Sequence, residues 1–256
     1  IPMLDKMVRG GIPRGFLVCV AGEPGTGKTI FCLHFAWRGL EKGGTAIYVT
    51  TEEDRESIIK QAEMFNFKFR KALEEGRLIV IDALIPRRND RWCLMSLNVE
   101  DLVNKIIEAK KELGHGWCRC VIDSLSAFWL DKPAMARNYS YIIKKTLHPW
   151  RMTVVAVTQY AITTSQAFGF GLEHVSDGVI RFMKVVRKGQ LKRYILIEKM
   201  RCTAHDLYLH EIRIVDGVGL TVLPSSGERK EDIVLPRKVV EKILEAKKRK
   251  EEEIGY

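Results

Sequence analysis

Short apolar runs alternate with amphipathic stretches over the first 160 residues. The runs are rich in Val and Ile and are apolar throughout, which is typical of strands buried on both faces of a sheet. The stretches between them repeat apolar residues at helical spacing. This alternation predicts an α/β fold, with a mostly parallel central sheet and helices on both faces. The predicted strands are 16–21, 46–49, 78–81, 120–122 and 153–157, and the predicted helices are 29–40, 54–64, 99–113 and 134–147.

The pattern changes after residue 178. Strand-like segments follow one another to residue 223, with turn signals at Lys188-Gly189-Gln190 and Asp216-Gly217, so we expect a C-terminal antiparallel hairpin extension of the sheet. Residues 236–253 alternate Lys and Glu blocks around a narrow apolar stripe, which predicts a charged C-terminal helix. No repeat or linker divides the chain, and residues 1–256 are therefore predicted to form a single domain.

Composition adds three expectations. The chain has 256 residues, of which 46% are hydrophobic, enough to bury a full core. It has no apolar run of transmembrane length and no secretory signal pattern, so we expect a cytoplasmic protein with no membrane partner. Its six cysteines include no CxxC pair. Cys118 and Cys120 alternate on a predicted strand, which leaves a metal site open but favours buried apolar side chains.

The first chemical motif lies between the first predicted strand and the first predicted helix. It fits the pattern GxxxxGK[ST], in which glycines let backbone N–H groups surround an anion while a helix turns the positive end of its dipole toward the phosphates. We therefore predict a phosphate loop and helix start that bind a nucleoside triphosphate, formed by Gly22, Glu23, Pro24, Gly25, Thr26, Gly27, Lys28, Thr29 and Ile30.

Two residues of this loop, with one carboxylate elsewhere, predict a site for a nucleoside triphosphate and Mg²⁺. Lys28 should reach the β- and γ-phosphate oxygens, and the Thr29 hydroxyl should ligate Mg²⁺. Asp123 ends the apolar run Cys120-Val121-Ile122, and it can hold Mg²⁺ through the water shell of the ion. An apolar strand that ends in Asp is common, so this second motif has weight only because it follows a phosphate loop.

Three further polar residues end predicted strands. We predict that Glu52 is the general base that orients and deprotonates the attacking water, assisted by Glu53. In the alternative, both acids only begin the helix 54–64, where the dipole favours them. Gln159 closes the strand 153–157 and is a candidate γ-phosphate sensor, although an amide at this place is also compatible with a solvent-facing side chain.

Together these motifs resemble the KaiC/RecA-like ATPases, and most closely the archaeal RadA paralogues of RadC type. The resemblance covers nearly the whole chain and implies a RecA-like P-loop ATPase core with Mg-dependent ATP hydrolysis. The residues that carry it are Leu4-Asp5-Lys6, Gly10-Gly11-Ile12-Pro13-Arg14-Gly15, the phosphate loop, Thr50-Thr51-Glu52-Glu53, Val121-Ile122-Asp123-Ser124, Gln159, Glu173-His174-Val175-Ser176-Asp177-Gly178 and Lys199-Met200-Arg201.

The last of these segments implies an oligomer. In similar ring-forming ATPases the Lys and Arg of such a triplet reach the γ-phosphate bound by the neighbouring subunit, so the resemblance assigns this role to Lys199 and Arg201. It also implies a homo-oligomer, either a ring or a head-to-tail stack. In the alternative, the two residues are surface cations on an edge strand.

A single-stranded DNA partner is the next expectation. In RecA-like proteins the loop after the γ-phosphate sensor lines the DNA path, and here this loop carries the aromatic residues Tyr160, Phe168 and Phe170, which can stack on bases. Residues 137–193 contain ten basic residues against two acidic ones, a candidate polyanion surface. The alternatives are aromatic residues in a subunit interface and a merely solvated basic face. Further candidate DNA contacts are Arg87, Arg88, Arg91, Arg187 and Lys188.

Two functions follow. The first is an ATPase that binds single-stranded DNA and modulates homologous recombination or DNA repair, with a RadA-type recombinase as a candidate partner. The second is a KaiC-like signalling or scaffold ATPase, with protein partners and no role on DNA. Stimulation of ATP hydrolysis by DNA would separate them.

Overall fold

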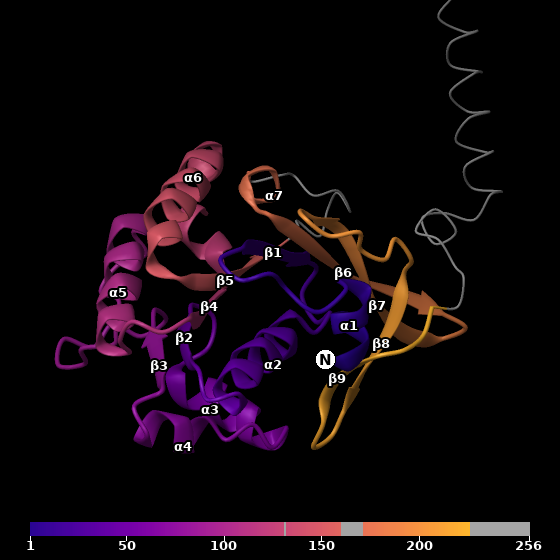
Figure 1. Cartoon of the computed structure of the whole chain (residues 1–256), viewed down its shortest axis with the longest axis horizontal. Coiled ribbons are helices and arrows are strands. Elements are labelled where there is room, and N and C mark those ends of the chain that lie inside the picture. Colours follow the sequence, from indigo (N-terminus) through magenta and orange to yellow (C-terminus); the bar gives the residue numbers. More distant parts are fainter. Residues whose placement is uncertain (131, 160–170, 226–256) are drawn as a thin grey trace, which may run out of the picture.

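The computed structural model describes residues 1–130, 132–159 and 171–225. They form a nine-stranded sheet with the strand order β3-β2-β4-β5-β1-β6-β7-β8-β9 (Figure 1). The strands are β1 (Leu17–Gly22), β2 (Thr45–Thr50), β3 (Leu78–Asp82), β4 (Cys118–Asp123), β5 (Met152–Gln159), β6 (Gly178–Arg187), β7 (Gln190–Met200), β8 (His210–Val215) and β9 (Gly219–Val222).

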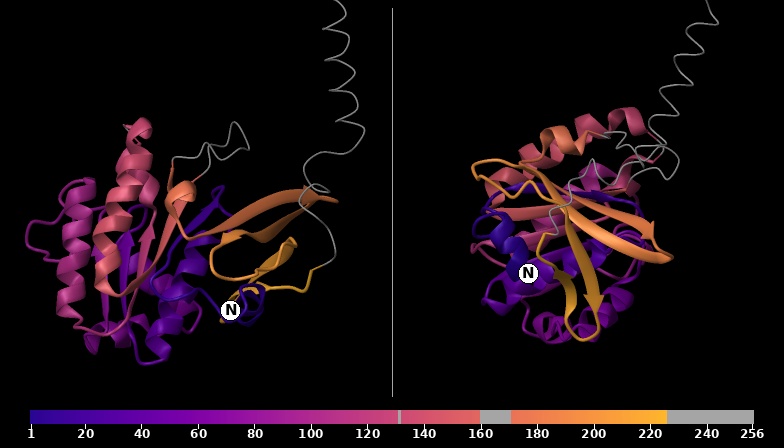
Figure 2. Two further views of the ribbon diagram at one scale, coloured as in Figure 1. Left: turned by 45° about the horizontal axis from the view of Figure 1, so that its top comes forward. Right: turned by 90° about the vertical axis from the view of Figure 1, so that its right-hand side faces the viewer.

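Six neighbouring strands, in the order β3, β2, β4, β5, β1 and β6, run parallel to one another. Parallel neighbours require crossover connections between them. The strands β7, β8 and β9 are antiparallel additions. The views agree that the antiparallel strands extend to one side of the helix-covered part (Figure 2). The predicted fold class, mostly parallel with a C-terminal antiparallel extension, is confirmed.

Helices cover both faces of the parallel strands. One face carries α2 (Lys28–Glu41), α3 (Arg55–Met64) and α4 (Phe69–Glu74), and the other carries α5 (Val99–Glu112) and α6 (Ala136–Leu147) (Figure 1). The short α1 (Pro2–Met7) lies beside β9, at the antiparallel part of the sheet. Because successive side chains of a strand alternate between faces, Val18 and Val20 of β1 pack under α2, while Cys19 and Ala21 belong to the core under α5 and α6.

Four predicted helices are present within two residues of the expected bounds. The last begins at Ala136 and not at residue 134, because Pro133–Met135 forms a separate 3₁₀ turn. The pattern did not predict α1, α4 or the short α7 (Leu172–Val175), which are each about one to two turns long. The turn between β6 and β7 contains Lys188 and Gly189, both with positive φ, as expected of a two-residue hairpin.

Two predictions fall outside these ranges or depend on them. The charged helix at 236–253 lies outside the described residues, and the single domain spanning 1–256 stays a prediction for the same reason. Within the part of the chain that the structure describes, no helix is both long and apolar enough to span a bilayer.

Candidate nucleotide site

The candidate site forms where four neighbouring parallel strands end. The strands are adjacent in the order β2, β4, β5 and β1, and their registers place Thr50 beside Asp123 and Gly22 beside Gln159. Because carboxyl ends of parallel strands meet at one edge, this pairing brings together motifs from four distant parts of the sequence. Ligands of open α/β sheets bind at this edge.

The phosphate loop leaves β1 and enters α2 directly. Gly25 and Gly27 have φ values of 76° and 101°, in the left-handed region that favours glycine. Lys28 Nζ donates a hydrogen bond of 2.8 Å to the Glu23 carbonyl, which also accepts one from the Thr26 hydroxyl. Burial lowers the pKa of Lys28, whereas Asp123 and Glu52 nearby oppose that shift. The lysine is therefore held inside the loop beside two acidic groups.

Asp123 lies at the end of β4, only 8% exposed. Burial raises the pKa of its carboxyl to about 6, while hydrogen bonds from the Thr29 and Tyr48 hydroxyls favour the charged form. The Tyr48 hydroxyl donates across 2.9 Å. A carboxylate beside a threonine hydroxyl is a set of hard oxygen donors, which fits Mg²⁺. The structure thus brings together the two residues predicted to serve the metal.

The two candidate bases point to different partners. Glu52 is exposed at the sheet edge, and its Oε1 accepts a hydrogen bond from Gln159 Nε2. Glu53 instead accepts a hydrogen bond from Gln61 of α3, and burial raises its pKa. Glu52 and Gln159 therefore form a pair beside the phosphate loop, whereas Glu53 faces α3.

Lys199 and Arg201 lie toward the amino-terminal ends of the parallel strands, opposite the candidate site. Lys199 Nζ donates to the Ser176 carbonyl at 2.7 Å, and Arg201 lies 3.4 Å from the carboxylate of Asp177. Lys199 pairs with Val179 of β6, and Val179 pairs with Cys19 of β1. Lys199 is therefore level with a residue that lies three positions before Gly22, where the phosphate loop begins. At about 3.3 Å per residue this separates Lys199 from the start of its own loop by about 10 Å along the sheet. Within one chain, the structure does not bring these two cations to the site.

The candidate DNA contacts are also spread over the surface. Arg87 and Arg88 are exposed on the loop after β3, and Lys188 is exposed at the tip of the β6–β7 hairpin, which also carries Arg187. Arg91 is bound within the chain, to Glu108 and Glu112, and stacks over Trp92. Tyr160, Phe168 and Phe170 lie outside the described residues.

Two cations of the β6–β7 hairpin contact the phosphate loop, which the sequence alone did not indicate. Lys184 Nζ donates to the Pro24 carbonyl, and Arg193 Nε donates to the Gly25 carbonyl, each at 2.8 Å. Both residues were counted only as part of a basic stretch. Their role depends on β6 pairing beside β1, and no local sequence signal indicates that pairing.

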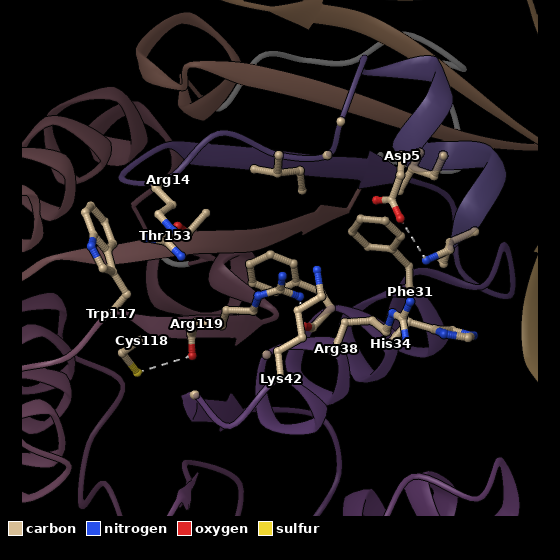
Figure 3. A pocket seen from close by; sticks show the side chains of 18 of the residues that line it. Asp5, Arg14, Phe31, His34, Arg38, Lys42, Trp117, Cys118, Arg119 and Thr153 are labelled. Atoms are coloured by element: carbon tan, nitrogen blue, oxygen red, sulfur yellow. Dashed lines mark hydrogen bonds and ion pairs between the residues drawn. The ribbon is translucent and has the colours of Figure 1, made fainter.

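A cavity of about 300 Å³ lies at the amino-terminal ends of the parallel strands, beneath the last turns of α2 (Figure 3). Arg14, Arg38, Lys42 and Arg119 surround it, with Trp117 at one end. Arg119 donates to the Phe35 carbonyl and stacks on the Phe35 ring. No residue of the phosphate loop lines this cavity, so it is separate from the candidate nucleotide site.

The fold and the site define a P-loop nucleotide-binding protein with a RecA-like sheet. The family model described as "ATPase: KaiC" matches residues 1–227, and the chain belongs to this family. The predicted membership of the KaiC/RecA-like ATPases is thus confirmed at the level of the KaiC family.

Relatives and solved structures agree with this result. A UPF0273 protein of Thermotoga maritima is 34% identical over 89% of this chain and 95% of its own length. A UPF0273 protein of Methanopyrus kandleri is 36% identical over 84% of this chain and 87% of its own. The crystal structure of a KaiC-like protein from Pyrococcus horikoshii is 28% identical, with a TM-score of 0.74, and covers 88% of this chain and 96% of that one. These names do not separate out a RadA paralogue, so the narrower resemblance stays a prediction.

Proposed function

We propose that this chain hydrolyses ATP with Mg²⁺ at the edge formed by β1, β2, β4 and β5. One observation carries the proposal: the phosphate loop, Asp123, Glu52 and Gln159 come from four strand ends and face one place. Family membership supports ATPase activity in general terms. Bound Mg²⁺ would neutralise charge on the β- and γ-phosphate oxygens.

The residues of the chain have distinct roles in this proposal. Lys28 exchanges the Glu23 carbonyl for phosphate oxygens. Asp123 and Thr29 hold the metal, and Glu52 orients the attacking water. Gln159 is hydrogen-bonded to Glu52, so a change at the γ-phosphate is transmitted to the end of β5. Glu53 accepts a hydrogen bond from Gln61, near the middle of α3, and does not touch the water.

The proposal includes a homo-oligomer, a ring or a stack. Lys199 and Arg201 are held toward the amino-terminal ends of the parallel strands, so each can assist hydrolysis only at the loop of another copy. Such a contact is head to tail, because different surfaces of the two copies meet. Both cations sit on or next to the last residues of β7, whose pairing with β6 gives them a rigid base.

The partner is the open part of the proposal. For single-stranded DNA, the support is that Arg87, Arg88 and Lys188 are exposed and form no ion pair among the described residues. Against it, several cations of the basic stretch are bound within the chain. These are Lys144 with Asp177, Arg181 with Glu198, Lys192 with Glu211, and Lys184 and Arg193 with the phosphate loop. That observation favours the second function, a KaiC-like scaffold with protein partners.

Turnover of ATP by a matched pair of variants tests the site. Glu52→Gln should retain ATP binding and lose most of its turnover, because the base is removed and the hydrogen-bonding shape is kept. Glu53→Gln is the control, and it should keep turnover near that of the wild type. Loss in Glu53→Gln with retention in Glu52→Gln would contradict the assignment. Adding single-stranded DNA to the same assay separates the two partner classes.

A further inference from the structure

Two cations from the antiparallel hairpin bind the outer side of the phosphate loop. Lys184 of β6 and Arg193 of β7 are directly paired in the ladder. They donate 2.8 Å hydrogen bonds to consecutive carbonyls of the loop, those of Pro24 and Gly25. Lys184 also lies 3.6 Å from the carboxylate of Glu23.

The geometry of the peptide unit gives these two bonds a consequence. In a trans peptide the C=O and N–H groups point to opposite sides. A Pro24 carbonyl turned toward Lys184 therefore turns the N–H of Gly25 away from the hairpin, and a Gly25 carbonyl turned toward Arg193 does the same for the N–H of Thr26. These N–H groups are the anion-binding donors of a phosphate loop.

Packing from outside reaches the end of the loop but not its tip: Gly27 faces Ile212, Ile214 and Leu220 of β8 and β9. At Gly25 a side chain would meet nothing within 4 Å, so side-chain packing does not fix the peptide there. On the inside, and among the described residues, the hydrogen bonds of Lys28 and of the Thr26 hydroxyl go to the Glu23 carbonyl and not to Pro24 or Gly25. The hairpin can supply the missing support.

The base of the hairpin is itself fixed to the loop and to α2. Phe182 packs edge-on against Phe31 at 5.6 Å, and Gly22 lies so near the Phe182 carbonyl that a Cβ would sit 2.3 Å from it. The two cations therefore project from an anchored strand pair.

We propose that Lys184 and Arg193 are positioning residues that preorganise the phosphate loop from within the same subunit. They orient the Gly25 and Thr26 amides for the phosphates, and a charge on the carbonyl side strengthens each N–H as a donor. Neither side chain contacts the nucleotide. The proposal rests on the proposed function, since it needs nucleotide phosphates at this loop.

Binding of nucleotides to three neutralised variants tests this role. Lys184→Gln and Arg193→Gln should each weaken ATP and ADP about tenfold, as expected when one hydrogen bond from a charged donor is lost. The effect should appear in Kd and KM, with kcat changed far less, and Lys184→Arg should restore binding. Lys192→Gln is the matched control, because Lys192 adjoins Arg193 but binds Glu211 at 2.9 Å.

A second measurement needs no ligand. Hydrogen exchange at the Gly25 and Thr26 amides should accelerate in the double variant Lys184→Gln/Arg193→Gln, with the melting temperature close to that of Lys192→Gln. If the wild type binds no nucleotide, the proposed function fails, while this measurement still shows whether the two cations order the loop.

Three results would overturn the inference. The first is wild-type affinity in both variants together with unchanged exchange. The second is an equal loss in Lys192→Gln, which would indicate a general effect of charge. The third is weakened ATP with unaffected ADP, which would mean that the cations touch the γ-phosphate directly.

Discussion

Acid should weaken the attachment of the C-terminal strands to α2, through His34. The His34 ring is 9% exposed and packs against Phe67, and its Nε2 accepts a 2.8 Å hydrogen bond from the Leu220 backbone N–H. Burial, with a smaller effect of nearby positive charges, lowers the pKa of His34 to about 4. Protonation of Nε2 would place its N–H against the N–H of Leu220, so two donors would face each other in a buried contact.

The sign and size follow from linkage. The unfolded chain binds the proton near pH 6.5, before the folded chain does. The contribution to stability is therefore complete above about pH 6.5 and is lost as the pH falls toward about 4. A pKa difference of this size corresponds to about 3 kcal/mol in the free energy of unfolding.

Asp123 requires a control, because its pKa is raised to about 6. Its contribution to the free energy of unfolding therefore increases on acidification, opposite to that of His34. The variant His34→Gln keeps an acceptor for Leu220 and cannot titrate. Urea unfolding of both chains at several pH values between about 7.5 and about 4.5 isolates His34, because the Asp123 effect cancels in the difference. The stability advantage of the wild type should shrink by about 2 to 3 kcal/mol on acidification. A difference that does not change with pH would refute the reasoning.

Three other predictions test separate parts of the account. Gly22→Ala should cost about 1 to 3 kcal/mol of stability, measured by urea unfolding, because its Cβ would meet the Phe182 carbonyl at 2.3 Å; unchanged stability would contradict the close approach of β6 to β1. Mixing Arg201→Ala chains with Lys28→Ala chains should restore part of the ATP turnover that each lacks, whereas no rescue at any ratio would argue against help from a neighbour. Affinity for single-stranded DNA should fall steeply between about 50 and about 200 mM salt, and a flat response would remove the electrostatic argument for DNA.

The parallel half of the fold could be predicted because its strands are apolar on both faces. A strand such as β1 (Leu17–Gly22), which is buried throughout, needs no knowledge of its neighbours to be recognised. The phosphate loop and Asp123 are local patterns as well, so their residues could be named from the sequence.

What the sequence did not predict depends on contacts between distant segments. The bonds of Lys184 and Arg193 to the loop require the pairing of β6 with β1. The hydrogen bond of Tyr48 to Asp123 joins residues 75 positions apart. Tyr48 lies within β2, whose sequence pattern predicts only a buried strand. The divergence of Glu52 and Glu53 depends on where Gln159 and Gln61 lie. Adjacent acids look alike in the sequence and differ only in the folded chain.

Calorimetric titration with MgATP is the most direct test of the central claim, that residues 22–29 bind a magnesium–triphosphate complex. Wild-type protein should bind ATP and a non-hydrolysable analogue with one site per chain, and Lys28→Ala should bind both far more weakly while remaining folded. Absence of binding by the well-folded wild type, or equal binding by Lys28→Ala, would contradict the account.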